Sequence, residues 1–176
     1  DPNSLAFWYF PQSLGGRRGF APSEDLYNAY EAGDVRRDAS IALDGSGDRY
    51  GIKYFRVANG DDNILVIRLA DMYLTRAEAN ARLGADAATV RADIDIIRDR
   101  AGLGPLPTTV DTEDELIDAI LQERRVEFAM EGHRFFDLRR TGRAEAVLKI
   151  NSNRLLFPIP QAEIDVNSNL TQNPGY

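Results

Sequence analysis

The chain of 176 residues has no cysteine, one histidine and no long apolar run. Without cysteine it can form neither a disulfide nor a thiolate metal site. Its longest apolar candidate, residues 64–74, is interrupted by Arg68 and Asp71. A membrane-spanning helix needs roughly 18 apolar residues in succession. These absences exclude thiol chemistry, cysteine-bound zinc and a spanning helix within this sequence.

Positive charge is also in short supply. The net charge is −7 and the isoelectric point is about 4.8. A protein that binds nucleic acid through its phosphates needs a basic face. Three arginine pairs are present, but each lies among Asp and Glu, which favours ion pairs within the protein. We therefore expect no nucleic-acid partner. The pairs are Arg36–Arg37, Arg124–Arg125 and Arg139–Arg140.

The single histidine, His133, offers little for catalysis. Zinc and iron sites usually take more than one His or Cys, and no HExxH spacing is present. A glycosidase sets two carboxyl groups roughly 5–9 Å apart across a cleft, and nothing marks such a pair here. We expect no catalytic residue, no metal and no other cofactor. His133 is predicted to be structural, at the turn that Gly132 makes.

The central part of the chain has helical periodicity. Residues 65–83 and 87–101 each carry one apolar stripe, the second with spacing 3, 4, 3, 4. The very short link between them predicts an antiparallel hairpin of the tetratricopeptide type. The stripes are Val66, Ala70, Tyr73, Ala77 and Ala81 in the first helix and Ala87, Val90, Ile94, Ile97 and Ala101 in the second.

A third helix is expected from the capping box of Thr112 and Glu115 to about residue 131. Short helices are expected at 134–140, 144–148 and 161–165, with an extended tail at 155–160. In the third helix, carboxylates recur at i, i+4 and i+8 and form an acidic ridge: Glu123, Glu127 and Glu131. We predict that arginines compensate this ridge and dock helices, namely Arg124, Arg125, Arg134, Arg139 and Arg140.

The first third of the chain has loop composition. Residues 1–22 are rich in Gly, Pro and aromatics, and residues 7–10 could form a short strand. Ser23 is expected to cap a short helix that Gly33 ends. Residues 39–43 and 50–57 are expected to be extended around a turn at 44–47. Tyr50, Tyr54 and Phe55 are predicted to be core or sheet-face residues.

Four segments resemble, in order and spacing, the C-terminal part of the SusD/RagB family. The segment ERRVEFAMEGHRFFDLRR at residues 123–140 is the most specific. Residues 26–37 also fit the family's segment before the helical repeats. The other three are RLADMYLTRAEA at 68–79, IRDRAGL at 97–103, and FPIPQAEID with NLTQNPGY at 157–176.

This resemblance implies a mostly α fold of tetratricopeptide-like hairpins with extended loops and a few short strands. It places one C-terminal SusD/RagB-like domain over residues 1–176. Residues 1–63 would be a loop or extended region with one short helix, and residues 64–176 the helical part. A full member is longer, so we expect the N-terminal part, signal peptide and lipidated cysteine to lie outside this chain.

The resemblance also implies a function. Family members are lipid-anchored in the bacterial outer membrane, face outward, and bind oligosaccharides or, in some members, peptides. They deliver these nutrients to a SusC-like TonB-dependent transporter and are not enzymes. We therefore expect non-catalytic glycan binding. The alternatives are a peptide-binding member, a helical scaffold that contacts a protein through residues 65–101, and a carbohydrate-active hydrolase.

Three consecutive aromatics, Trp8, Tyr9 and Phe10, are the candidate ligand contacts. Sugar rings present flat C–H faces that pack on aromatic rings, and three large aromatics in a Gly/Pro-rich segment cannot all enter one core. In an extended segment Trp8 and Phe10 would share one side. Arg17 and Asn3 are candidate hydrogen-bonding neighbours. Alternatively, the rings pack on the helices or cover other parts of the protein.

Overall fold

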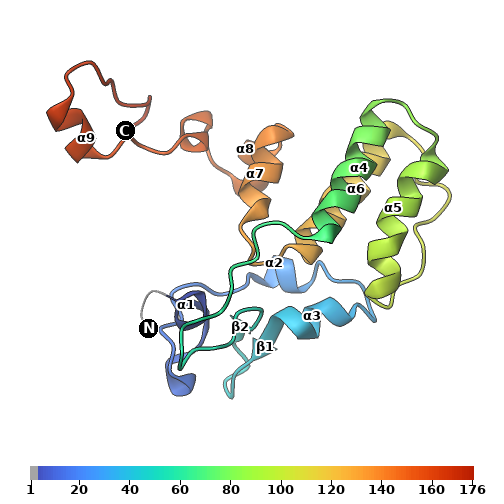
Figure 1. The fold of residues 1–176 in the computed structure, drawn as a ribbon, viewed down its shortest axis with the longest axis horizontal. Helices are drawn as coiled ribbons and strands as arrows, with labels where there is room; N and C mark the ends of the chain where they lie inside the picture. The colour runs from blue at the N-terminus through green and yellow to red at the C-terminus, as the bar shows by residue number, and fades with distance from the viewer. Residues whose placement is uncertain (1–3) are drawn as a thin grey trace. The chain divides into compact units, whose positions relative to one another are not determined.

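The computed structural model describes residues 4–176, and the predicted mostly helical fold is confirmed (Figure 1). The chain divides into two compact units at residues 133 and 134. The first unit contains α1 (Leu5–Tyr9), α2 (Glu24–Tyr27), α3 (Val35–Ser40), α4 (Leu69–Arg82), α5 (Ala87–Arg100), α6 (Glu113–Glu127), a 3-10 turn (Gln12–Leu14), β1 (Ile41–Leu43) and β2 (Arg49–Gly51).

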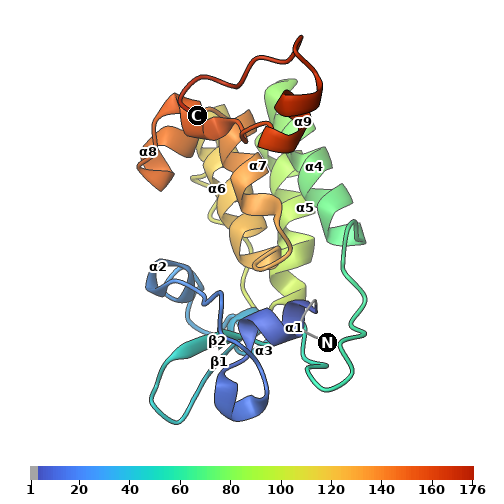
Figure 2. The same ribbon diagram turned by 90° about the vertical axis from the view of Figure 1, so that its left-hand side faces the viewer.

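The core of the first unit is the predicted hairpin of α4 and α5 packed on α6, three helices that run side by side in Figure 2. Asp86 caps α5 by accepting hydrogen bonds from the backbone N–H groups of Ala88 and Thr89. Thr112 and Glu115 form the predicted capping box of α6. The α5 stripe is confirmed, since Val90, Ile94, Ile97 and Ala101 are buried and Ala87 is partly buried.

Two helix boundaries predicted from periodicity are wrong. The first helix begins at Leu69 rather than at 65, and Val66 is 71% exposed. The backbone of Arg68 is extended, and its guanidinium pairs with Glu127 and Glu131. The third helix ends at Glu127 rather than at 131, because Met130 has a φ of 65°.

The N-terminal third holds more helix than expected. Residues 7–10 do not form a strand; α1 spans most of them, and the Ser4 side chain accepts from the Phe7 N–H at its start. Ser23 caps α2 as predicted, but α2 ends at Tyr27, well before Gly33. A further helix, α3, follows the cap of Asp34. Residues 4–63 therefore hold three short α-helices rather than one.

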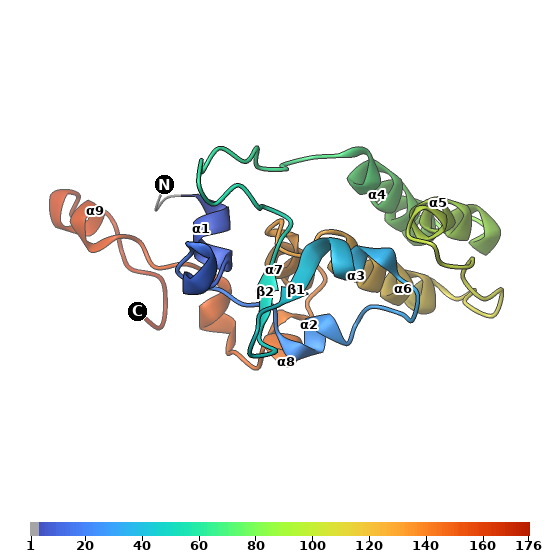
Figure 3. The same cartoon turned by 90° about the horizontal axis from the view of Figure 1, so that it is seen from below.

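The two predicted extended segments meet as one antiparallel pair, in which Ile41 lies opposite Gly51. Residues 39 and 40 belong to α3, and the second strand stops at Gly51, so both strands are shorter than predicted. Figure 3 shows the β1–β2 ribbon between α1 and α3. Tyr54 is buried as expected, but Phe55 is exposed.

The second unit contains the rest of α7 (His133–Arg140), then α8 (Ala144–Leu148), a 3-10 turn (Ser152–Leu155) and α9 (Gln161–Val166), close to the predicted helices. The hydroxyl of Tyr176 donates to the carbonyl of Leu156 at 2.9 Å. Leu138 is buried and Phe136 is exposed. No helix within residues 4–176 has the length and apolar character needed to cross a bilayer.

Replacing Ile94 by alanine tests the three-helix core. Ile94 is 0% exposed on α5, whereas its helix neighbour Ile96 is 46% exposed. We expect Ile94→Ala to lower the free energy of unfolding by about 2–5 kcal/mol, because it leaves a cavity. Ile96→Ala should cost less than about 1 kcal/mol. Urea unfolding followed by circular dichroism measures both, and a loss below about 0.5 kcal/mol for Ile94→Ala would contradict this packing.

Candidate functional site

The N-terminal helix gathers aromatic side chains into one cluster. The Trp8 ring lies 5.7 Å from that of Phe20 and 6.1 Å from that of Phe7, between ring centroids. The Tyr9 ring lies 6.2 Å from that of Phe20. Arg17 places its guanidinium carbon 4.8 Å from the Trp8 ring centre. We call these five residues, Phe7, Trp8, Tyr9, Arg17 and Phe20, the Trp8 cluster.

Backbone hydrogen bonds hold the loop of residues 16–20 against α1. The N–H of Arg17 donates to the Phe7 carbonyl at 2.7 Å, and that of Phe20 to the Trp8 carbonyl at 3.1 Å. A Cβ at Gly19 would lie 2.5 Å from Cε3 of Trp8, so only glycine lets the ring rest on this loop. The positions of Arg17 and Phe20 are therefore set by backbone geometry before any ligand arrives.

The structure brings together three of the four predicted ligand contacts. Trp8, Tyr9 and Arg17 share the cluster, whereas the ring of Phe10 lies against Tyr50 at 5.2 Å. Trp8 and Phe10 do not share a side as predicted, because the segment is helical rather than extended. Asn3 lies outside the described residues.

Sequence reasoning missed Phe20, whose ring contacts both Trp8 and Tyr9 and is 58% exposed. The available signal was its place directly after the glycine-rich stretch that ends at Gly19. Burial raises the pKa of Tyr9, and nearby Tyr54 adds to the shift. The Tyr9 hydroxyl therefore stays neutral at physiological pH and can donate a hydrogen bond.

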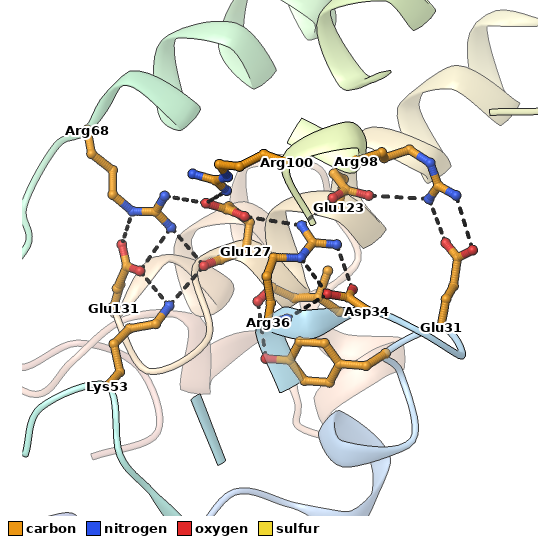
Figure 4. Close-up of polar contacts among 12 residues, drawn as sticks. Glu31, Asp34, Arg36, Lys53, Arg68, Arg98, Arg100, Glu123, Glu127 and Glu131 are labelled. Atoms are coloured by element: carbon orange, nitrogen blue, oxygen red, sulfur yellow. Dashed lines mark hydrogen bonds and ion pairs between the residues drawn. The ribbon is translucent and has the colours of Figure 1, made fainter. Parts of the chain in front are cut away.

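A second concentration of polar groups surrounds the acidic ridge of α6, shown in Figure 4. Arg36, Arg68 and Arg100 converge on the Glu127 carboxylate from three different elements. The other two ridge carboxylates are paired as well: Glu123 with Arg36 and Arg98, and Glu131 with Lys53 and Arg68.

The predicted compensation of the ridge by cations that dock helices is thus confirmed, and the cations described on it are ones that the sequence did not single out. Arg124 pairs with Asp71 at 2.7 Å, and Arg125 pairs with Asp25. Arg124 and Arg125 follow Glu123 directly, and consecutive residues on a helix point in different directions. In the second unit, Arg140 pairs with Asp137 at 2.8 Å.

A cavity of about 360 Å³ lies beside this network in the first unit. Five cations and five carboxylates are joined there, so their formal charges cancel and leave no excess for an ionic ligand. The cations are Arg36, Lys53, Arg68, Arg98 and Arg100, and the carboxylates are Glu31, Asp34, Glu123, Glu127 and Glu131. The cavity is lined by Val35, Arg36, Ala39, Ser40, Lys53, Leu65, Arg68, Arg100, Glu127 and Glu131.

Burial and ion pairing compete at the ridge. Burial alone would raise the pKa of Glu127, but hydrogen bonds from Arg100 and Arg68 outweigh it and lower the pKa to about 2. At Glu123 the effect of burial is larger than that of the ion pairs, so the pKa is raised although Arg36 and Arg98 lower it in part. The lowered pKa of Glu127 means that its ion pairs stabilise the fold above pH 4.5 and lose this contribution as the pH falls towards 2.

His133 packs its ring on Phe128, with ring centroids 4.6 Å apart, and its Nδ1 lies 3.4 Å from Arg124. This packing fits the predicted structural role. Across residues 4–176, no group of three or more His, Asp or Glu side chains is arranged to hold a metal ion.

Glu127→Gln tests the network. The substitution leaves three guanidinium groups around a neutral side chain, so we expect the free energy of unfolding at pH 7 to fall by about 3–5 kcal/mol. The more exposed Glu113→Gln, on the same helix, should cost less than about 1 kcal/mol. The difference between wild type and Glu127→Gln should shrink as the pH approaches 2. Equal losses for both variants at pH 7 would contradict the network.

Gly19→Ala tests the geometry of the Trp8 cluster. Trp8 is the only tryptophan, so its fluorescence reports this site alone. Because the new methyl group would occupy the place of the ring, we expect Trp8 to move towards solvent and its emission to shift to longer wavelength. Gly45→Ala is the control, since a Cβ there meets nothing within 4 Å. Unchanged emission in Gly19→Ala would show that Trp8 does not rest on this loop.

Comparison with known proteins adds independent evidence. A model of the SusD family matches residues 53–154 and 144–176. The SusD-like protein P38 of Formosa agariphila is 35% identical over 161 residues, which cover 82% of this chain and 32% of that protein. The starch-binding protein SusD of Bacteroides thetaiotaomicron is 40% identical over 129 residues, 66% of this chain and 22% of that protein.

The fold has solved counterparts. The surface glycan-binding protein A from Bacteroides fluxus superposes with a TM-score of 0.76 and 31% identity, over 100% of this chain and 43% of that one. The chain thus spans less than half the length of these relatives. Because the family model matches most of the chain, the resemblance found in the sequence is confirmed, and the chain belongs to the SusD family.

Proposed function

We propose that this chain is part of a non-catalytic protein that captures glycans, and that the Trp8 cluster contacts the sugar. The observation that carries the proposal is the exposed ring of Phe20, held beside Trp8, whose ring also contacts the guanidinium of Arg17. Two of the relatives compared are described as starch-binding and surface glycan-binding proteins. Family membership and local chemistry thus support the same ligand class.

The cluster offers both kinds of contact that sugars use. A pyranose ring has C–H groups on its faces, which pack on an aromatic ring, and hydroxyls at its edge, which accept and donate hydrogen bonds. Phe20 provides an exposed ring beside Trp8, and Arg17, which lies over the Trp8 ring, provides N–H donors. Since backbone hydrogen bonds already fix the loop, little conformational entropy is lost on binding.

The environment of the carboxylates supports binding without catalysis. A general acid for glycoside cleavage needs a carboxyl with a raised pKa beside the sugar. Asp44, which pairs with Arg18 of the same loop, has its pKa lowered by backbone N–H bonds from Ser46 and Asp48. The three ridge carboxylates are buried and already paired with cations. None of these carboxylates belongs to the Trp8 cluster, where we propose that the sugar binds.

Family membership supports the remaining parts of the proposal. The captured oligosaccharide would pass to a SusC-like TonB-dependent transporter. The protein would face outward from the bacterial outer membrane, anchored by a lipid outside this chain. A peptide ligand, as in RagB-like members, is the alternative within the family.

A helical scaffold without a small ligand is the second candidate function. One observation favours it: the segment before α4 exposes consecutive apolar side chains, and α4 continues them with Leu69 and Met72. Exposed apolar patches often mark protein contacts. The segment's exposed residues are Ile64, Leu65, Val66 and Ile67. This candidate predicts that the contact surface is α4 and its approach, not the Trp8 cluster.

Phe20→Ala tests the glycan proposal. A glycan array and a peptide library identify the ligand, and calorimetry then compares variants. We expect Phe20→Ala to weaken glycan binding about tenfold or more, because it removes the stacking surface. Phe55→Ala is the matched control, since Phe55 is 66% exposed and Phe20 58%. It should bind as wild type does.

Two results would count against the proposal. Glycan binding that survives both Phe20→Ala and Trp8→Ala would place the site elsewhere. No binding of any glycan by the wild-type protein would favour the scaffold, or the peptide-binding alternative if a peptide binds.

A further inference from the structure

Arg17 is the cation of the Trp8 cluster, and it differs from its neighbour Arg18 in its partners. No carboxylate of residues 4–176 forms an ion pair with it, although the sequence has 28 acidic against 21 basic residues. Its neighbour Arg18 shows the usual outcome, with ion pairs to Asp44 at 2.5 Å and Asp48 at 3.4 Å. In an acidic protein, an arginine left unpaired beside a binding surface is available to a ligand.

The geometry of Arg17 keeps its donors free. Its guanidinium lies over the Trp8 ring, a cation–π contact that restrains the group without using any N–H bond. Within the described part of the chain, the Arg17 side chain makes no hydrogen bond, and the residue is exposed. The backbone is fixed by its bond to the Phe7 carbonyl, and Arg18, with a φ of 53°, follows in the left-handed region.

A guanidinium with free N–H groups in one plane matches a carboxylate, which accepts two parallel hydrogen bonds from it. Neutral sugars offer only hydroxyls, which accept hydrogen bonds from the guanidinium but carry no opposite charge. The net charge of −7 repels anions at long range, so the attraction must act at contact and must weaken with salt.

We propose that the Trp8 cluster selects acidic glycans, with a uronic acid ring packed on Phe20 and its carboxylate bound by Arg17. This inference rests on the proposed glycan-binding function and adds the substrate class. The charge-balanced network at Glu127 is a separate site and takes no part in it.

Matched pairs of oligosaccharides test the inference. Oligomers of galacturonic, glucuronic and mannuronic acid are each compared with the product in which the carboxylates are reduced to hydroxymethyl groups. By calorimetry at low salt, we expect wild type to bind an acidic member about tenfold more tightly than its reduced partner. Arg17→Gln should bind both members of the pair equally, and added salt should reduce the wild-type preference.

Arg154→Gln is the matched control, because Arg154 also lies over an aromatic ring, 4.9 Å from the centre of Tyr176, but in the second unit. It should keep the wild-type preference. Equal wild-type affinity for both members of each pair, or a preference that persists in Arg17→Gln, would overturn the inference while leaving glycan binding intact. If wild type binds no glycan, the proposed function itself fails, and an acidic peptide bound through Arg17 would replace the sugar acid.

Discussion

Glu127 is a buried carboxylate that cannot be stable without its cations. Moving such a group out of water costs several kcal/mol unless ion pairs and hydrogen bonds compensate. Here the compensation comes from Arg36 at the start of α3, Arg68 just before α4 and Arg100 at the end of α5. Each cation lies on a different element, so the three elements must reach α6 together for the carboxylate to be satisfied.

The ion pairs of Glu127 also help to position the Trp8 cluster, through the chain connection from α3 to the β-strands and the packing of β2 on α1. Arg36 fixes α3, and α3 runs directly into β1, which pairs with β2. At the end of β2, a Cβ on Gly51 would meet the Tyr9 ring at 3.1 Å, so the strand lies directly against α1. The turn between the strands also carries Asp44, which holds Arg18 and with it the loop below Trp8. The packing of the helices on α6 and the position of the Trp8 cluster therefore depend on each other.

Interactions close in sequence were predictable. The 3, 4, 3, 4 spacing around Ile94 identified the buried face of α5, because burial on a helix follows its period. Thr112 and Glu115 identified the start of α6, because the capping box is a contact over three residues. Both patterns involve residues three or four positions apart, so they can be read from a single sequence.

Interactions distant in sequence were not predictable in the same way. The acidic ridge was evident, but its partners lie up to 91 residues away, as Arg36 does from Glu127. Helix α1 was missed because its five residues include three aromatics, which resemble a strand, and its Ser4 cap is a weak signal alone. Phe20 lies in the Trp8 cluster only because the loop of residues 16–20 folds back against α1. Family resemblance predicted the architecture correctly but carried no information on these contacts.

The fluorescence of Trp8 during a glycan titration shows whether a glycan binds on the Trp8 cluster. Trp8 is the one tryptophan of this chain of 176 residues, so in this chain any change in emission comes from this surface. With the tightest oligosaccharide from the array, the account predicts a saturable change in emission whose midpoint gives the same Kd as calorimetry. Binding heat without any change in Trp8 emission would contradict it, because the sugar would then bind away from the cluster.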